Sequence, residues 1–302
     1  MQRYRPQQEF LFYGNYFYGV CAVAQSVEAM LQQRYVLNGV GYFLLVFAGT
    51  VLYYDYPYAR KYKADGGNPR IAWYIAHYRF VWWNQVVITV ILSCALAMLA
   101  YQHLDYLLAM SLLNWFLLII FPVVASLYYG INFLSRRYNL RTIGWLKPFI
   151  IGFIWSGLVA IYPLLYYNIT HQQDYTVTVI GSLLFVKNLM FISLLAIMFD
   201  VKDYAVDHAS RLRTIVVKFG LRRTVFFILL PLPVLGLLTF VYYGSTHDFH
   251  VMKIILNAIP FILLLMAARS LRRRRTMMYY LVVIDGLMLV KAMCGITAMV
   301  FF

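Results

Sequence analysis

Three aspartates with helical spacing are the strongest chemical feature of this sequence. Asp200, Asp203 and Asp207 stand at positions i, i+3 and i+7 of the stretch FDVKDYAVD. On a helix they lie within about 60° of one another and form one carboxylate stripe, which Arg211 continues if the helix continues. Grouped carboxylates repel one another and favour a compensating cation. Their oxygen atoms suit a hard ion such as Mg²⁺, which usually binds through one or two carboxylates and substrate phosphates.

A second interpretation of these aspartates is structural. In this interpretation they belong to a solvated loop and balance the charges of neighbouring lysines and arginines. The spacing alone leaves both interpretations open, so the elements that position the aspartates become important.

Composition places the chain among membrane proteins. Of its 302 residues 63% are hydrophobic and 12% are charged, with a mean hydropathy of +0.70, whereas soluble domains are near half apolar and a quarter charged. The formal net charge of +15 does not indicate nucleic-acid binding, because the basic residues lie between apolar runs and orient the chain in the bilayer. The three cysteines lie inside apolar runs without metal-ligand spacing, which predicts core residues and no zinc site.

Nine apolar runs predict an all-α membrane protein with nine transmembrane helices. Helices are expected because lipid offers no partners for free backbone groups. We expect a single domain over residues 1–302, in which residues 55–79 and 200–223 form cytoplasmic loops that cap the site. The predicted spans are Leu11–Leu31, Val40–Tyr54, Phe80–Ala100, Tyr106–Gly130, Phe149–Tyr167, Val177–Phe199, Thr224–Tyr243, Val251–Ala268 and Met278–Phe302.

Basic residues alternate sharply between the connecting segments. Most of the 26 lysines and arginines lie at the N-terminus or in the loops after spans two, four, six and eight, whereas the opposite loops hold only Arg34 and, at a span edge, Lys253. The positive-inside rule then predicts a cytoplasmic N-terminus and a C-terminus on the far side. A bacterial inner (plasma) membrane is the expected location.

Polar residues inside the predicted spans need partners or water. Glu28, Lys187, Asp285 and Lys291 are costly there because lipid does not solvate charge. We expect Lys187 to pair with Asp285 between spans six and nine. A structural and a cavity-lining function are both open for these residues, and Asn15 is a further candidate for the same cavity.

The segment Asp200–Gly220 resembles a motif of a known family. It reads D-x-x-D-x-x-x-D followed by Arg213-Thr214 and Lys218-Phe219-Gly220, which is similar to the second aspartate motif of the UbiA-type intramembrane prenyltransferases. That family has nine transmembrane helices and two aspartate motifs in the cytoplasmic loops after helices two and six. The match lies in the corresponding loop, and the stretch Leu127–Lys147 is similar to the family's basic stretch after helix four.

The resemblance implies Mg²⁺-dependent transfer of a polyprenyl group from an isoprenoid diphosphate to a lipophilic acceptor, often an aromatic ring, within the bilayer. Mg²⁺ and cationic side chains stabilise the departing diphosphate, and a dry cavity protects the carbocation. By the same resemblance Asp200, Asp203 and Asp207 would be catalytic and would hold Mg²⁺. The expected diphosphate-binding residues are Arg60, Lys61, Arg211 and Arg213. No nucleic-acid or protein partner is expected beside these substrates and membrane lipid.

The first aspartate motif departs from the family's pattern, which is N-D/Q-x-x-D-x-x-x-D at the inner end of helix two. When Asp55 is aligned with the central aspartate, Val51 takes the asparagine position, Leu52 the next and Ala59 the last. Asp55 is therefore the one metal-binding and catalytic candidate of this motif. Half of the two-sided metal clamp is weakened.

Two other functions are consistent with the sequence. The first is a non-catalytic binder of lipid diphosphates, or membrane scaffold, that kept one motif. The second is a transporter that uses Lys187, Asp285 and Glu28 as a relay. A binder would retain isoprenoid diphosphate without releasing pyrophosphate. A transporter would show interrupted helices and a polar path through the membrane. The gathering of the acidic residues at one face favours phosphate chemistry there.

Overall fold

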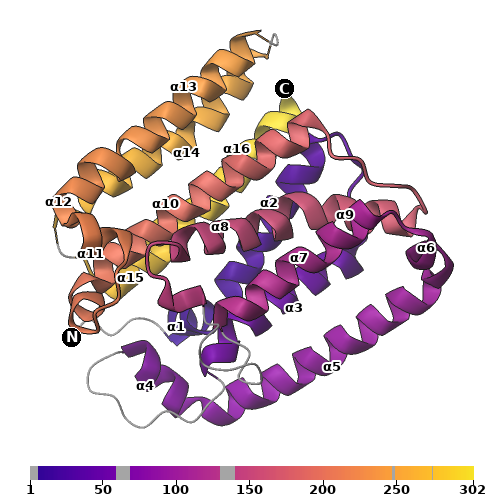
Figure 1. The fold of residues 1–302 in the computed structure, drawn as a ribbon, viewed down its shortest axis with the longest axis horizontal. Helices are drawn as coiled ribbons and strands as arrows, with labels where there is room; N and C mark the ends of the chain where they lie inside the picture. The colour runs from indigo at the N-terminus through magenta and orange to yellow at the C-terminus, as the bar shows by residue number, and fades with distance from the viewer. Residues whose placement is uncertain (1–5, 59–68, 130–139, 247–248, 274) are drawn as a thin grey trace. The chain divides into compact units, whose positions relative to one another are not determined.

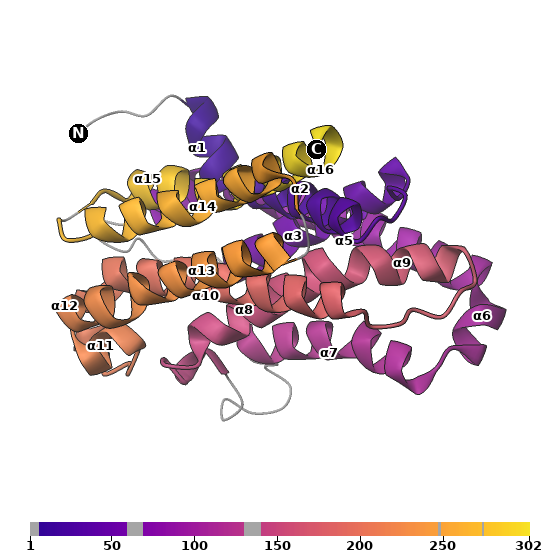
Figure 2. The same cartoon turned by 90° about the horizontal axis from the view of Figure 1, so that it is seen from above.

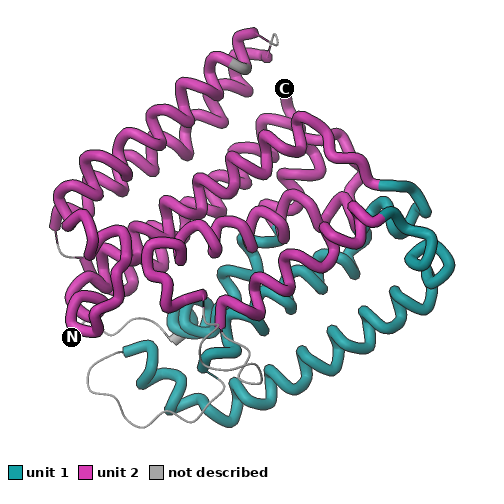
Figure 3. Tube along the Cα trace, in the orientation of Figure 1, with its two compact units in different colours: residues 1–23, 38–111, 166–174 teal, residues 24–37, 112–165, 175–302 magenta. Residues whose placement is uncertain are grey.

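The computed structural model of the chain describes residues 6–58, 69–129, 140–246, 249–273 and 275–302. Every regular element in these ranges is helical, which confirms the predicted all-α class. The chain divides into two compact units, which are described separately (Figure 3). Unit 1 comprises residues 1–23, 38–111 and 166–174, and unit 2 comprises residues 24–37, 112–165 and 175–302.

Unit 1 is built around two pairs of packed helices. Its elements are α1 (Pro6–Tyr13), the first part of α2 (Tyr16–Gln32), α3 (Val40–Asp55), the 3₁₀ turn η1 (Tyr56–Tyr58), α4 (Pro69–Ala76), α5 (Tyr78–Gln102), α6 (Leu104–Ala109) and the end of α9 (Tyr162–Thr170). Helix α1 packs against α4, and α3 packs against α5. α4 begins at Pro69, a residue that suits the first turn of a helix because no N–H is needed there.

Unit 2 contains the remaining helices. They are the rest of α2, α7 (Leu112–Tyr129), η2 (Leu140–Thr142), α8 (Lys147–Ser156), η3 (Gly157–Ile161), the start of α9, α10 (Val179–Ala209), α11 (Ile215–Phe219), α12 (Leu221–Thr224), η4 (Val225–Leu229), α13 (Pro231–Thr246), α14 (Val251–Ser270), α15 (Met277–Tyr279), η5 (Tyr280–Ile284) and α16 (Gly286–Phe301). Helices α8 and α10 lie side by side, as do α13 and α14 (Figures 1 and 2). η3, η4 and η5 are π-helical segments.

Small residues bring the helices of unit 2 into close contact. A Cβ atom at Gly152 of α8 would lie 2.6 Å from the carbonyl oxygen of Leu189 in α10. Gly157 likewise faces the ring of Phe121 in α7. Within lipid, association depends on such close packing because burial of apolar surface gives helices little advantage over contact with lipid tails. The contact between α8 and α10 fixes the helix that carries the three aspartates.

Seven helical stretches are long and apolar enough to cross a membrane, as judged over the described ranges. They are Tyr78–Gln102, Leu112–Tyr129, Lys147–Thr170, Val179–Ala209, Leu221–Thr246, Val251–Ser270 and Met277–Phe301. These correspond to the third to ninth predicted spans, so the count of nine is not confirmed. The first predicted span is interrupted at Asn15, whose φ of 60° is left-handed. The second is α3, whose 16 residues reach about 24 Å, less than the roughly 30 Å of hydrocarbon in a bilayer.

Candidate functional site

Asp200 is the most enclosed of the predicted acidic site residues. Its side chain lies in α10 and is fully buried. The Nζ atom of Lys147, the first residue of α8, donates a hydrogen bond to Oδ1 of Asp200 at 2.5 Å. Oδ2 has no hydrogen-bond partner among the described residues. Since buried polar atoms are normally paired, this oxygen marks a place where a cation or a donor can bind.

The length of α10 carries the aspartates beyond the apolar part of the helix. Thr178 caps the start of α10, because its hydroxyl accepts a hydrogen bond from the Gly181 N–H at 3.0 Å. Its 31 residues extend over about 46 Å, more than the roughly 30 Å of hydrocarbon in a bilayer. Residues 200–209, predicted as the start of a loop, are therefore the helical end of α10. The loop starts later than predicted because the helix continues through the aspartate motif.

The three aspartates have different surroundings. Asp207 is buried like Asp200, and its Oδ2 also lacks a partner in the described ranges. The side chain of Asp203 is 42% exposed and lies 3.2 Å from Nζ of Lys202. The positive charges of Lys147 and Lys202 act on Asp207 electrostatically. The predicted carboxylate stripe is thus a buried pair with one outward-facing member.

Lys147 is a further residue of this site, which its place in the basic stretch Leu127–Lys147 did not reveal. It opens α8 and is followed by Pro148 at the start of the helix. A cation is disfavoured at a helix N-terminus because the helix dipole is positive there. A lysine at the start of a predicted helix was therefore the sequence feature that could have revealed this residue, because such a lysine needs a nearby carboxylate. The structure supplies Asp200, 53 residues away in sequence.

The end of α10 separates the predicted arginines from the aspartate stripe. The helix stops at Ala209 in a Schellman motif, in which the Leu212 N–H donates to the Asp207 carbonyl oxygen at 2.9 Å. Arg211 occupies the left-handed position of this motif with φ of 57°. Both Arg211 and Arg213 are exposed, and within the described part of the chain no hydrogen bond or ion pair joins them to the aspartates. Arg211 therefore does not extend the stripe.

The variant Arg211→Gly is expected to be more stable than Arg211→Ala by about 1 kcal/mol. A left-handed backbone strains residues that carry a Cβ atom, and glycine avoids that strain. Both variants remove the same charge, so their difference isolates the backbone effect. Thermal unfolding of the purified protein in detergent measures it. Equal melting temperatures would contradict the assignment of strain to this position.

Asp55 lies in a closed polar network within unit 1. It is the last residue of α3 and is buried. Its Oδ1 accepts hydrogen bonds from Asn15 Nδ2 and from the Tyr74 hydroxyl, both at 2.7 Å. Arg70 Nη2 donates to Asn15 Oδ1 at 2.5 Å. The predicted metal ligand of the first motif is therefore engaged by side chains from the α1–α2 break and from α4.

Tyr74 and Arg70 complete the electrostatics of this network. Burial, followed by the charge of Asp55, raises the pKa of the Tyr74 hydroxyl, which stays protonated and donates. The ring of Tyr58 stacks on Tyr74 with centroids 4.2 Å apart, and the Arg70 guanidinium lies 4.9 Å from the Tyr58 centroid. Arginine keeps its charge in such surroundings. Arg70 thus brings a positive charge to the network of Asp55. The place of Arg70 in the loop sequence did not reveal that it lies in this network.

Asn15, predicted to line a cavity, instead links the elements of unit 1. It is fully buried, and its left-handed backbone is one that asparagine tolerates.

Asn15→Gly is expected to lower the free energy of unfolding by about 1–3 kcal/mol through the lost hydrogen bonds. Asn15→Ala should lower it by about 1 kcal/mol more because of the backbone strain. Thermal melts of both variants measure the two contributions, and equal losses would refute the second.

Apolar residues stand at the described positions that align with the polar residues of the family's first motif. Val51 is fully buried in α3, and Leu52 is half-buried. Ala59, Arg60 and Lys61 lie outside the described residues. Asp55 belongs to unit 1 and the α10 aspartates belong to unit 2. A metal site shared between them stays a prediction.

The polar residues inside the spans of unit 2 pair differently from the expectation. The Lys187 Nζ atom donates to Oδ1 of Asn257 at 3.2 Å and lies 3.8 Å from Oε1 of Glu28. Lys291 contacts Oε2 of Glu28 at 2.7 Å. The expected Lys187–Asp285 pair is thus replaced by a cluster around Glu28, because α2 supplies the carboxylate. Asp285 is buried just before α16.

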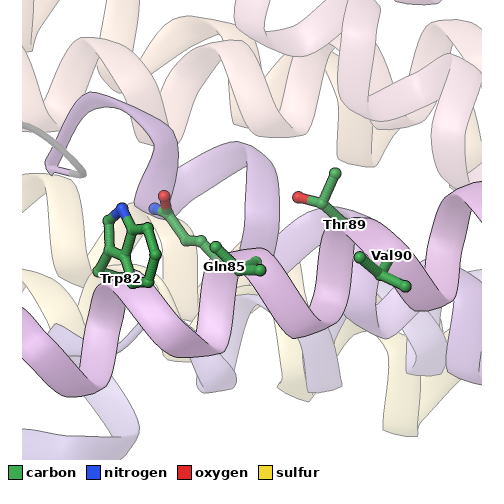
Figure 4. Close-up of a pocket in the computed structure, with 5 residues that line it drawn as sticks. Trp82, Gln85, Thr89 and Val90 are labelled. Atoms are coloured by element: carbon green, nitrogen blue, oxygen red, sulfur yellow. The ribbon is translucent and has the colours of Figure 1, made fainter.

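A separate pocket lies on α5 of unit 1. It has a volume of about 320 Å³ and is lined by Trp82, Gln85, Val86, Thr89 and Val90. The side chains of Trp82, Gln85 and Thr89 project from the same side of the helix (Figure 4). None of the predicted site residues lines this pocket.

The residues of α10 fit a divalent cation only in part. Among the described residues, no three of the His, Cys, Asp and Glu side chains gather closely enough to hold a metal. Asp200 and Asp207 nevertheless each have an unpartnered buried oxygen, and carboxylate oxygens are the ligands that Mg²⁺ prefers. The donor set therefore fits an ion that takes its other ligands from water and a phosphate group.

Comparison with known proteins bears on the fold. No protein-family model matches the chain, and none of the curated proteins compared with it does. A solved structure reported in a study of digeranylgeranylglyceryl phosphate synthase in membranes matches with a TM-score of 0.56 and 15% identity, covering 98% of this chain and 99% of that one. The chain has the UbiA-type prenyltransferase fold. At this identity the likeness concerns the fold.

The UbiA-type fold agrees with the resemblance of Asp200–Gly220 to the family's second motif, and it extends that likeness from one segment to nearly the full length. Together with the seven apolar helices it identifies the chain as an integral membrane protein. The roles of individual residues rest on the site itself.

Proposed function

We propose that this chain transfers a polyprenyl group from an isoprenoid diphosphate to a lipophilic acceptor, with an aromatic ring as the favoured acceptor, inside the bilayer. The observation that carries the proposal is the buried carboxylate pair at the end of α10. Asp200 and Asp207 each keep an unpartnered oxygen, and Lys147 is held against Asp200. Uncompensated buried carboxylate oxygens are costly, so a functional cation at this position is the simplest explanation. The UbiA-type fold supports the same function.

The residues have distinct roles in this proposal. Asp200 and Asp207 would hold Mg²⁺, which when bound supplies positive charge to the leaving diphosphate. Lys147 holds Asp200 in place and adds a positive charge beside it. Asp203 faces outward and contributes to the local field, not to a metal. Arg211 and Arg213 follow the same end of α10 and, with Arg60 and Lys61, remain proposed contacts of the diphosphate oxygens.

The chemistry is balanced without further reactants. The allylic carbon–oxygen bond breaks, and its electron pair leaves with the diphosphate. A nucleophilic atom of the acceptor forms the new bond to the allylic carbon and then loses a proton, which the released diphosphate can accept. The reaction requires apolar surroundings that exclude water, which would otherwise capture the carbocation.

The test uses the full chain in lipid vesicles supplied with radiolabelled farnesyl or geranylgeranyl diphosphate, a panel of lipophilic aromatic acceptors and Mg²⁺. We expect pyrophosphate release that depends on the acceptor and stops when EDTA removes the metal. Release that persists in EDTA would refute the metal-dependent mechanism. Tight binding of diphosphate with no release for any acceptor would refute the transferase.

A second candidate is a non-catalytic binder of lipid diphosphates. It is favoured by Asp55, whose Oδ1 already accepts two hydrogen bonds in a buried network. A first motif used for structure leaves the second motif to bind a diphosphate alone. The outcome of binding without release would favour this function.

The orientation in the membrane follows from the charge distribution. The proposal places the N-terminus and the aspartate end of α10 in the cytoplasm and the C-terminus outside, in a bacterial inner membrane. Labelling of single cysteines added at the two termini, with a reagent that does not cross the membrane, distinguishes this orientation from the reverse one.

A further inference from the structure

A cluster of charged side chains lies inside unit 2, away from the aspartates of α10. Glu28 of α2 is buried between two lysines, Lys291 of α16 and Lys187 of α10. Asn257 of α14 accepts a hydrogen bond from Lys187 at 3.2 Å. Gly295 of α16 makes room for the carboxylate, since a Cβ atom there would lie 2.5 Å from Glu28 Oε1. Four helices therefore contribute to one polar site in an apolar bundle.

The hydrogen bonds of this cluster do not join Lys187 to the carboxylate of Glu28. Oε2 of Glu28 binds Lys291 at 2.7 Å, and Oε1 accepts from Gln32 at 3.1 Å. Lys187 stays 3.8 Å from Oε1, beyond hydrogen-bond distance. One carboxylate balances one ammonium, so the cluster carries a surplus positive charge on Lys187. Of its three N–H groups, one donates to Asn257 and the Phe240 ring lies 5.5 Å away.

Lys187 is also partly accessible at a depth where water is scarce. It lies 13 residues before Asp200 on α10, which places it about 20 Å along the helix from the proposed diphosphate site. Its side chain is 15% exposed, and the nearby Leu183 and Val186 of the same helix are exposed and apolar. An ammonium group that faces hydrocarbon is costly without an anion or water.

A second polar group of the cluster region also lacks partners. Gln25 precedes Glu28 by three residues on α2, so the two side chains lie on the same face of the helix. Gln25 is 1% exposed, and neither its Nε2 nor its Oε1 has a hydrogen-bond partner among the described residues. A buried amide with both atoms unpaired can hydrogen-bond to water or to a bound molecule.

We propose that Lys187 binds the carboxylate of a long-chain amphiphilic lipid, such as a fatty acid, that enters from the hydrocarbon. The ligand is a monoanion because the cluster has one surplus charge. A carboxylate accepts hydrogen bonds from the free N–H groups of Lys187 and from an amide such as Gln25. The apolar exposed residues beside Lys187 suit an acyl chain, whereas a small anion such as chloride would give up its hydration without gaining apolar contacts in return. The site is separate from the aspartates of α10 and does not depend on the proposed transferase function.

The test measures equilibrium binding of radiolabelled oleate to the full-length protein in detergent. Wild-type protein is expected to retain oleate and not its methyl ester. Lys187→Met should weaken oleate binding at least tenfold, and Lys187→Arg should restore most of it. Lys218→Met, which removes a lysine from the exposed surface of α11, is the matched control and should bind like the wild type.

Three results would overturn the proposal. They are unchanged oleate binding by Lys187→Met, equal retention of the methyl ester, and full displacement of oleate by chloride at equimolar concentration, which would indicate a small-anion site. Lys187→Met keeps the Glu28–Lys291 pair and is expected to fold. If it does not, Lys187→Gln, which can still donate to Asn257, replaces it with the same expected loss of binding.

Discussion

Replacing Asp200 by Asn is expected to lower the rate of prenyl transfer at least about a hundredfold, if the proposed function holds. The variant keeps an oxygen that can accept the hydrogen bond from Lys147 but loses the negative charge that would hold Mg²⁺. Removal of one group that stabilises developing charge typically costs about 10²–10³ in rate. The measurement is product formation from radiolabelled isoprenoid diphosphate in vesicles at saturating Mg²⁺.

Asp203→Asn is the matched control for this prediction. It makes the same change on the same helix, but its side chain is 42% exposed and lies next to Lys202. We expect its activity to fall by no more than about threefold, in keeping with the weak effects of exposed charges. Equal losses in the two variants would show that burial at the end of α10 does not mark the functional aspartates.

The stability of Asp200→Asn separates an effect on chemistry from an effect on folding. Lys147 loses its anionic partner in this variant, which costs stability. Adding Lys147→Met is expected to restore the melting temperature without restoring transfer. Recovery of transfer in the double variant would show that Asp200 acts only by balancing Lys147.

Replacing Glu28 by Gln is expected to lower the free energy of unfolding by about 3–5 kcal/mol. The change leaves the buried Lys291 and the largely buried Lys187 in one cluster without a carboxylate, and an uncompensated buried charge costs this much. Melting temperatures measured by fluorescence-detected size-exclusion chromatography in detergent report the loss.

Two further variants identify the cause of that loss. Glu28→Gln combined with Lys291→Met removes both members of the 2.7 Å pair and is expected to recover at least half of the stability. Gln32→Leu removes only the hydrogen bond to Oε1 and should cost about 1 kcal/mol. A double variant no more stable than Glu28→Gln would show that the buried charge is not the cause.

The two candidate functions differ in what they require of Asp55. In a transferase with a two-sided metal clamp, Asp55 would act as a metal ligand besides accepting hydrogen bonds from Asn15 and Tyr74. In a binder, or in a transferase that relies on α10, it keeps its hydrogen bonds and holds α3 and α4 together. The activity of Asp55→Asn therefore distinguishes these cases, since only the first predicts a loss as large as that of Asp200→Asn.

The membrane class, the all-α fold and the choice of the three aspartates as candidates followed from the sequence alone. Each depends on a local pattern: long apolar runs for the class, and the i, i+3, i+7 spacing for Asp200, Asp203 and Asp207. A local pattern does not require knowledge of which helices are neighbours. The apolar run Leu11–Leu31 predicted one continuous span, but the helix breaks at Asn15. The left-handed backbone of Asn15 is stabilised by hydrogen bonds to Asp55 and Tyr74, which are 40 and 59 residues away in sequence.

Only the tertiary structure decided the partners of the charged residues. Lys147 meets Asp200 because α8 packs along α10, and Lys291 meets Glu28 across 263 residues of sequence. Packing also buried two members of the aspartate stripe and left Asp203 exposed. Spacing gives the direction of a side chain on its helix, but it does not show which neighbouring helices bury that side chain. The sequence thus determined which residues can do chemistry at the end of α10. Packing determined that Asp200 and Asp207 are buried, and burial strengthens their electrostatic interactions because these depend on distance and on exclusion of water.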